Sequence, residues 1–204
     1  MGRILPRDFY DRDTETVSRE LLGAVLETET EHGRTTGIIV ETEAYLGEHD
    51  PACHAVVGRT RRTNPLYGKP GIAYVYFIYG VHWCFNAVTR REGLPSAVLV
   101  RAVEPLEGEE LMRMRRGPKP REVDLTNGPG KLCAALGIDG AMNGLPVQRR
   151  PIVIREGEPV AKELIETTPR IGITRAADWP LRYLLRGNQW VSRAPKTRKP
   201  ASSE

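Results

Sequence analysis

Two glutamates and a tyrosine alternate along one segment of the chain, a spacing that could bring their side chains together. Glu41, Glu43 and Tyr45 follow the apolar run at 37–40, and alternate residues of a strand share one face. A carboxylate on such a face can take a proton from water or stabilise a developing positive charge. Glu43 is the preferred base because it lies closer to Tyr45 in the sequence, and Glu41 is its rival. The alternative is a solvated strand end, because a carboxylate buried without a partner loses its hydration.

A second segment, at 71–86, is dominated by aromatic and β-branched residues, which favour strands. On a strand Tyr74 and Tyr76 share one face and Tyr79 lies on the other. A glycine follows Tyr79, and glycine adopts the positive φ that a tight turn can need. The segment therefore predicts a β-hairpin with Tyr79 at its tip. If the pairing centres on residue 81, Asn86 lies opposite Tyr76.

Basic residues flank both segments and bear on the role of the tyrosines. The long polar connection at 47–69 carries Arg59, Arg61 and Arg62. Rings for stacking, a carboxylate and a basic surround are the residue types that an enzyme acting on nucleic-acid bases needs. Two ordinary interpretations stay open: a core hairpin whose tyrosines are buried with satisfied hydroxyl groups, and a solvated connecting loop.

The length and composition are those of one globular domain. The chain has 204 residues, of which 40% are hydrophobic and 27% charged, and its formal net charge is +4. A charge this small permits nucleic-acid binding but does not by itself indicate it. The first residues lack the apolar core of a signal peptide, and the longest apolar run, at 72–85, is shorter than the ~20 residues of a membrane span. We therefore expect a soluble protein of the cytoplasm, nucleoid-associated if bacterial.

The cysteines and histidines do not suggest a metal site. The three cysteines form no C-x-x-C pair and their number is odd, which fits a reducing, cytosolic setting. Five side chains of metal-binding type lie between residues 49 and 84, but their spacing matches no zinc pattern. They are His49, Cys53, His54, His82 and Cys84. We expect no metal and no cofactor.

Local patterns predict the order of the other elements. Strands are expected at 25–30 and 36–45, which form a hairpin, and at 96–101, 151–155 and 183–185. Helices are expected from a cap at Thr14 or Thr16 to residue 22, at 106–116, and from an Asn127 cap to the stop at Gly137. The segment at 171–173 is expected to be buried, and residues 193–204 to form a basic disordered tail.

Six motifs follow one another along the chain. They are VETEAYLG at 40–47, KPGIAYVYFIYG at 69–80, the return strand to Asn86, RAVEPLEG at 101–108, NGPGKLCAALGI at 127–138 and RGNQWVS at 186–192. In this order and with this spacing they resemble the alkyladenine (3-methyladenine, methylpurine) DNA glycosylases. The resemblance covers about residues 22–192, nearly the whole chain, and it is the combination of motifs that is specific.

The resemblance implies a fold and a reaction. The fold is a single mixed α+β domain over residues 1–192, with a curved antiparallel sheet, flanking helices and a β-hairpin that projects into the minor groove of DNA. The reaction is the hydrolytic release of a flipped, damaged purine without metal or redox cofactor. The expected partner is double-stranded DNA that contains 3-methyladenine or 7-methylguanine, with ethenoadenine and hypoxanthine as open candidates. The expected state is a monomer.

The resemblance also implies catalytic roles. Glu43 corresponds to the base that activates water, and Arg101 helps to hold that water. The backbone carbonyl of Ile171 looks like a third partner of the water. None of the residues that the resemblance marks as catalytic is a lysine, so a lyase step through a Schiff base is not expected.

The pocket and the DNA contacts follow from the same resemblance. Tyr45, His54 and Tyr76 look like the walls of the base pocket, although a structural histidine is the ordinary interpretation of His54. Asn86 looks like the residue that rejects guanine, because the amino group on the purine C2 edge would clash there. Further DNA contacts are expected from the wedge Tyr79, its neighbours Val81 and His82, and the basic residues Arg59 and Lys131.

One departure concerns the tip of the hairpin. Val81 and His82 stand where relatives often carry methionine and then tyrosine or histidine, so we expect this tip to press less strongly into the base stack. Two rival interpretations of the whole chain are a non-catalytic nucleic-acid-binding module and a purely structural domain. Glu43 distinguishes an enzyme from the first rival. A module that only binds nucleic acid has no use for a carboxylate beside a phosphodiester, because the two negative charges repel each other.

Overall fold

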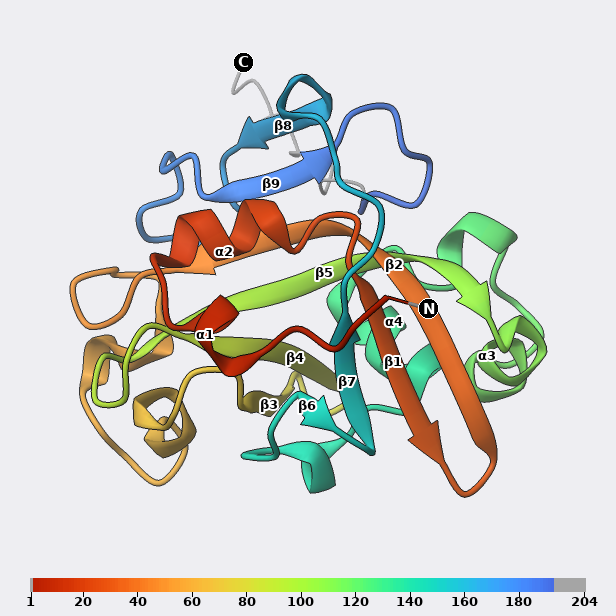
Figure 1. The fold of residues 1–204 in the computed structure, drawn as a ribbon, viewed down its shortest axis with the longest axis horizontal. Coiled ribbons are helices and arrows are strands. Elements are labelled where there is room, and N and C mark those ends of the chain that lie inside the picture. Colours follow the sequence, from red (N-terminus) through yellow and green to blue (C-terminus); the bar gives the residue numbers. More distant parts are fainter. Residues whose placement is uncertain (1, 193–204) are drawn as a thin grey trace, which may run out of the picture.

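The computed structural model describes residues 2–192, so the predicted tail at 193–204 lies outside the described residues. Within this part, a curled antiparallel sheet of nine strands runs in the order β3-β4-β5-β2-β1-β7-β6, with β9 beside β2 and β8 beside β9 (Figure 1). A few short helices flank the sheet. The predicted α+β class with a curved antiparallel sheet is confirmed. The strands are β1 (Val25–Thr30), β2 (Gly33–Tyr45), β3 (Ala73–Ile78), β4 (His82–Thr89), β5 (Ser96–Glu107), β6 (Gln148–Arg149), β7 (Ile152–Arg155), β8 (Ile165–Thr168) and β9 (Arg182–Leu185).

The helices are short because glycine and proline interrupt the chain often. The α-helices are α1 (Arg7–Tyr10), α2 (Thr14–Glu20), α3 (Glu109–Arg116) and α4 (Pro129–Leu136). Single turns of 3₁₀ helix lie at His54–Val57, Asn64–Tyr67, Glu122–Asp124, Gly140–Met142 and Lys162–Leu164. Within residues 2–192, no helix combines the length and the apolar character needed to cross a membrane.

Strand β2 is the strand on which the rest of the sheet is assembled. Its first half pairs with β1, its second half pairs with β9, and its other edge pairs with β5 along most of its length. The ladder to β5 has irregularities on both sides of Glu41, and such bulges increase the local twist of a strand. The end of β2 therefore leaves β1 and lies between β5 and a strand from the C-terminal part of the chain.

The two faces of the sheet have different characters. On one face Val40 and Ala44 belong to the main apolar core, and α1 and α2 cover this face (Figure 1). Thr42 points to the same side, where its hydroxyl accepts a hydrogen bond from Ser18 of α2 (3.1 Å). Alternation therefore directs Glu41, Glu43 and Tyr45 of β2, and Leu99 and Arg101 of β5, to the opposite face.

The hairpin of β3 and β4 has a register that differs from the expected one. Ile78 pairs with His82, so the pairing centres on residue 80, and Asn86 lies opposite Tyr74 instead of Tyr76. The predicted centre at residue 81 was wrong by one because Tyr79 itself adopts a left-handed conformation (φ 54°), which is rare for a residue with a side chain. The shift moves each partner by two residues, so Asn86, Tyr74 and Tyr76 still share one face.

The connection between β2 and β3 is folded, which corrects the interpretation as a solvated loop. Its residues Cys53, Ala55, Leu66 and Tyr67 form a second apolar cluster with Tyr74, Val88 and Ala97 from the sheet. The exposed arginines of this connection project from a packed segment. The tyrosines of the hairpin are therefore not members of the main core.

Several predicted boundaries and caps were wrong. The N-cap of α2 is Asp13, whose side chain accepts from the backbone N–H of Thr16. Strand β5 continues to Glu107 because it pairs with the first half of β2, so α3 begins only at residue 109. Asn127 does not cap α4, which begins after Gly128. The segment 171–173 is only partly buried.

Packing of Trp83 against Gly140 holds the hairpin on the body of the domain and gives a first prediction. A methyl group at Gly140 would lie 2.7 Å from the Trp83 ring, which in turn contacts the Phe77 ring at 4.7 Å between centroids. We expect Gly140→Ala to lower the free energy of unfolding by about 1–3 kcal/mol through overpacking, measured by urea unfolding. Gly128→Ala is the control, since its methyl group would meet Lys131 at 3.6 Å. Equal effects of the two substitutions would contradict this account.

Candidate active site

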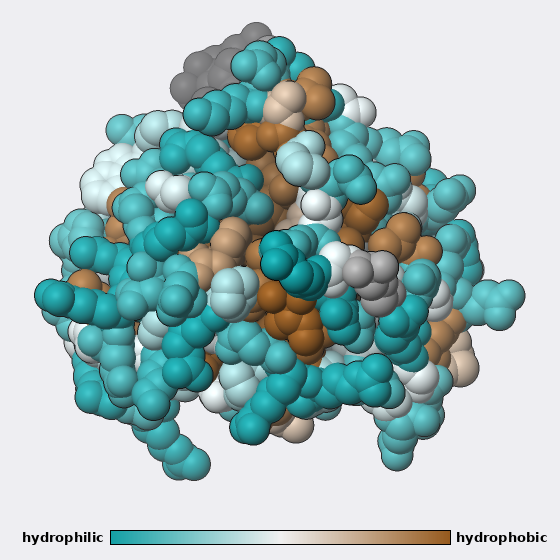
Figure 2. Space-filling model, in the orientation of Figure 1, coloured by the Kyte–Doolittle hydropathy of each residue, from teal (hydrophilic) through white to brown (hydrophobic). Residues whose placement is uncertain are grey.

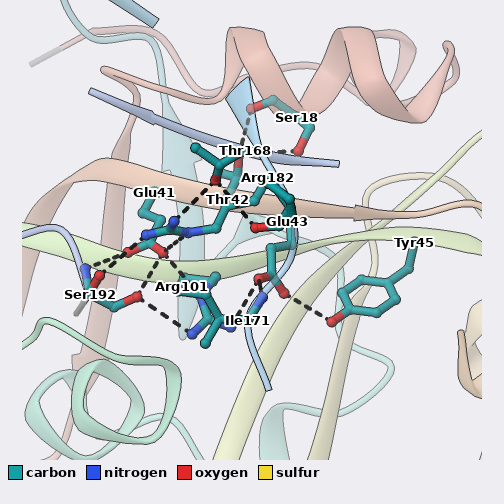
Figure 3. Close-up of polar contacts among 11 residues, drawn as sticks. Ser18, Glu41, Thr42, Glu43, Tyr45, Arg101, Thr168, Ile171, Arg182 and Ser192 are labelled. Carbon is teal, nitrogen blue, oxygen red and sulfur yellow. Dashed lines mark hydrogen bonds and ion pairs between the residues drawn. The ribbon is translucent and has the colours of Figure 1, made fainter. Parts of the chain in front are cut away.

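A cluster of buried charges lies on the face of the sheet opposite α2 (Figure 3). Glu41 and Glu43 are both completely buried. Arg101 from β5 lies between them: its Nε is 3.1 Å from Glu41 Oε1 and its Nη1 is 3.2 Å from Glu43 Oε1. Arg182 from β9 is the second cation, with its Nε 2.6 Å from Glu41 Oε1. The interpretation of the glutamates as a solvated strand end was wrong, because two arginines compensate their burial.

The two glutamates have different partners. Within residues 2–192, Glu41 accepts hydrogen bonds from Arg101, Arg182 and, through both the hydroxyl and the backbone N–H, Ser192. Three of these donors meet Oε1 and one meets Oε2, and of the partners only Arg101 lines the cavity described below. Glu41 is therefore a poor candidate for the base, and its contacts serve to hold Arg101.

Glu43 retains acceptor capacity. Its Oε1 accepts from the backbone N–H of Ile171 at 2.7 Å and contacts Arg101, and its Oε2 accepts from the hydroxyl of Tyr45 at 2.9 Å. Within residues 2–192, these three donors leave about one acceptor position on the Glu43 carboxylate for another molecule. The predicted contact of the Ile171 carbonyl with water stays a prediction, because the observed contact uses the N–H of the same residue.

The charge state of the cluster follows from its pairing. Burial would lower the pKa of Arg101, but the charges of Glu43 and Glu41 raise it above the ordinary value. Burial raises the pKa of the Tyr45 hydroxyl well above its ordinary value, and Glu43 raises it further. Arg101 is thus a permanent cation and Tyr45 a permanent hydrogen-bond donor to Glu43.

A cavity of about 430 Å³ opens beside this cluster. It is lined by predicted pocket and catalytic residues together with the root of the hairpin and the start of α4. The predicted residues on its wall are Tyr45, His54, Tyr76, Tyr79, His82, Asn86, Arg101, Lys131 and Ile171. Glu43 lies directly behind three of them, Tyr45, Arg101 and Ile171, each of which contacts its carboxylate. Among the described residues, Val81 and Arg59 do not line the cavity.

The aromatic wall is held by hydrogen bonds and ring contacts. Nδ1 of His54 lies 2.9 Å from the hydroxyl of Tyr74, and the His54 ring meets the Tyr76 ring edge-on with 4.5 Å between centroids. Burial and the charge of Arg62 lower the pKa of His54 to about 4, so its ring is neutral near pH 7. Asn86 is nearly buried and donates from Nδ2 to the carbonyl of Tyr74 (3.0 Å).

The predicted DNA contacts lie at different depths. Tyr79 at the hairpin tip is 81% exposed and Val81 is 65% exposed. Arg59 is exposed, although its Nε donates to Asn64. Lys131, at the start of α4, is bound to Asn127 (2.7 Å) and Asp124 (3.3 Å). The tip is therefore free to meet a partner, whereas Lys131 would have to exchange its contacts.

The sequence did not identify four residues of this region. Ser192 and Arg182 bind Glu41, and Arg170 and Asp50 form a buried ion pair beside Tyr45. Only Ser192 had a signal, as the last residue of a recognised motif. Among residues 2–192 no group of three or more His, Cys, Asp or Glu side chains is arranged to hold a metal.

Another hollow, of about 720 Å³, lies between α1, α2 and the segment 156–167. Figure 2 shows the molecule from the side of α1 and α2, with apolar residues gathered along the middle of the surface between hydrophilic ones. The lining of this hollow includes Arg19, Glu20 and Lys162, but none of the predicted site residues. The residues with catalytic potential therefore belong to the cavity beside Glu43.

Comparisons with known proteins identify the family of this chain. The family model described as Methylpurine-DNA glycosylase (MPG) matches residues 8–189. A protein of Methanocella arvoryzae is 48% identical over 88% of this chain and 89% of its own. A protein of Myxococcus xanthus is 48% identical over 97% of this chain and 98% of its own, and one of Carboxydothermus hydrogenoformans is 47% identical over 93% and 99%.

These three relatives carry the provisional name 3-methyladenine DNA glycosylase. The span matched by the family model includes all of the described strands and the residues that line the cavity. The chain belongs to the methylpurine-DNA glycosylase family, whose enzymes are hydrolases of the N-glycosidic bond.

Proposed function

We propose that this enzyme flips alkylated purines, such as 3-methyladenine and 7-methylguanine, out of duplex DNA and hydrolyses their glycosidic bond with water activated by Glu43. The observation that carries the proposal is the placement of Glu43. Its carboxylate is held by Tyr45, Arg101 and Ile171 immediately behind an aromatic cavity and retains an acceptor position. A water molecule bound there would lie between the carboxylate and a base in the cavity.

The cavity suits a flipped purine. Extruding a nucleotide costs a few kcal/mol, less for a damaged base that pairs poorly. Stacking on the rings of Tyr45 and Tyr76 would return roughly 1–3 kcal/mol per ring. Purines alkylated at N3 or N7 are cationic, and electron-rich rings attract cations. The neutral ring of His54 adds no repulsion.

Cleavage of the bond leaves positive character on the sugar. An ionised Glu43 would stabilise that charge and take a proton from the attacking water. Arg101 supports both steps, because its guanidinium holds the Glu43 carboxylate in place at 3.2 Å. The carbonyl of Ile171 is proposed as an additional acceptor for the same water.

The surface around the cavity suits DNA. Tyr79 at the exposed tip would fill the gap left by the flipped nucleotide, and Val81 and His82 would contact the neighbouring steps. The exposed arginines at 59, 61 and 62 would meet phosphates. The expected partner is duplex DNA, bound by a monomer.

A non-catalytic binding module is the alternative function. It would use the same basic and aromatic surface, but it has no use for the buried charges around Glu43. Release of free base from alkylated duplex DNA separates the two functions. Binding without any release, under conditions that support hydrolysis by relatives, would favour the module.

The role of Glu43 gives the second prediction. Glu43→Gln should keep binding of lesion-containing DNA and lower single-turnover excision by ~10²-fold or more, because glutamine cannot take the proton. Glu41→Gln is the matched control, and it should lose stability while excising faster than Glu43→Gln. Normal excision by Glu43→Gln together with an inactive Glu41→Gln would assign the base to Glu41.

Selectivity at Asn86 gives the third prediction. Asn86 lines the cavity opposite Tyr74, where its amide would meet the C2 amino group of a guanine. Asn86→Ser shortens the side chain and leaves the stacking rings in place, so release of undamaged guanine should appear while adenine lesions are still excised. Both rates are measured on the same preparation. If guanine is untouched and adenine lesions are excised normally, Asn86 is not the selectivity filter.

Salt dependence gives the fourth prediction. The logarithm of the association constant should fall by ~0.9 for each neutralised phosphate per tenfold rise in salt, measured by fluorescence anisotropy. Arg61→Gln should reduce that slope by about one phosphate. Arg150→Gln is the control, since Arg150 pairs with Glu29 in another part of the sheet. A slope near zero would exclude contacts of the arginine-rich connection with the backbone.

A further inference from the structure

We infer that the buried ion pair of Asp50 and Arg170 positions two groups that donate hydrogen bonds to Glu43, the Tyr45 hydroxyl and the Ile171 N–H. We also infer that the charge balance of this pair determines how well the cavity accepts a cationic base. This inference rests on the proposed function. Among the described residues, neither Asp50 nor Arg170 lines the cavity. Both are therefore positioning residues that act through Tyr45 and Ile171.

The ion pair is rigid and fully enclosed. Both side chains are completely buried, and the contact is bidentate, with Nη1–Oδ2 at 2.6 Å and Nη2–Oδ1 at 2.8 Å. Asp50 also accepts from the backbone N–H groups of Leu46 and Ala52. Burial acts to raise the pKa of Asp50, but the hydrogen bonds from Arg170 and from these N–H groups keep the pKa below its ordinary value. The pair is therefore ionised.

Arg170 contacts the active site in three ways. Its Nη1 donates to the carbonyl of Ala44 at 3.0 Å, between Glu43 and Tyr45 in the sequence. Its guanidinium carbon lies 4.7 Å from the centroid of the Tyr45 ring. The next residue, Ile171, donates its backbone N–H to Glu43 at 2.7 Å. Two of the donors to Glu43, the Tyr45 hydroxyl and the Ile171 N–H, thus depend on where Arg170 is held.

The position of Arg170 also has an electrostatic consequence. Tyr45 lines the cavity whereas Arg170, which stacks on the Tyr45 ring, does not, so a base on the other face of that ring would have the guanidinium behind it. An unbalanced cation there would repel a cationic purine and compete for the same π-electrons. Asp50 cancels that charge at hydrogen-bond distance. An uncompensated unit charge about 8 Å from a cationic base, at an effective dielectric constant near 20, changes affinity by roughly tenfold or more.

The test compares two DNA duplexes that carry bases of the same shape and different charge. One contains 7-methylguanine on a 2′-fluorinated sugar, which is cationic and resists hydrolysis, and the other contains the neutral 7-methyl-7-deazaguanine. The quantity measured is the ratio of their dissociation constants. Asp50→Asn leaves Arg170 uncompensated, so the preference for the cationic base should fall by roughly tenfold. Arg170→Gln removes the cation, so the preference should be kept or increased.

The double variant separates charge from position. Asp50→Asn with Arg170→Gln contains neither charge, so its preference ratio should be close to that of the unmodified protein. Its single-turnover excision of 7-methylguanine should still fall, by up to ~10²-fold, because Tyr45 and Ile171 are no longer held. Glu27→Gln is the matched control: Glu27 is buried and paired with Arg155 on β1 and β7, and its loss should leave both the ratio and the excision rate unchanged.

Each outcome is informative. If every variant loses the same affinity for both duplexes, the ratio of the two dissociation constants stays constant. The pair then has only a structural role and the inference is wrong. If Asp50→Asn does not fold, a fall in the ratio for Arg170→Gln would contradict the inference just as clearly. If the unmodified protein does not prefer either duplex over undamaged DNA, the proposed function fails, independently of this inference.

Discussion

Two carboxylates that cannot be buried alone organise this molecule. Glu41 and Glu43 project from the same face of β2 and are fully buried. Their burial is tolerated because Arg101 and Arg182 supply two positive charges at hydrogen-bond distance. Removing one partner of such a buried pair typically costs about 3–5 kcal/mol, because the remaining charge is uncompensated. The strand, its two arginine-bearing neighbours and the C-terminal segment are therefore tied to one another by charge neutralisation.

The same requirement explains the division of labour between the glutamates. Glu41 is held by four hydrogen bonds and fixes Arg101, so Arg101 can present a defined edge to Glu43. Glu43 is held by donors that also form the wall of the cavity, so the geometry of the wall and of the carboxylate are set together. The aromatic hairpin completes that wall, and its opposite face is anchored through Trp83 on the 3₁₀ turn at Gly140. The proposed catalytic geometry and the fold thus share the same contacts.

Local patterns predicted what depends on periodicity. The shared face of Glu41, Glu43 and Tyr45, the strand at 25–30 and the aromatic hairpin all follow from the period of two. The burial of the glutamates could not be predicted, because their compensating partners are distant in the sequence; those of Glu41 lie 60 to 151 residues away. In other places tertiary contacts prevail over local sequence preference. Pairing with β2 extends β5 into the segment expected to be helical, and Asn127 binds Lys131 instead of capping α4. The resemblance supplied the site residues, and the structure supplied their relations.

The contacts of Glu41 have a consequence for how the protein is made. Its partner Ser192 lies 151 residues later in the chain and its partner Arg182 lies 141 residues later. During synthesis from the N-terminus, β2 therefore emerges long before the residues that neutralise it, and contacts of such large sequence separation form late in folding. A nascent chain would hold both glutamates hydrated and its sheet incomplete until the C-terminal strand has left the ribosome. Assembly of the proposed catalytic centre therefore waits for residues 182–192, and a chain interrupted before them would lack two of the partners that hold Glu41.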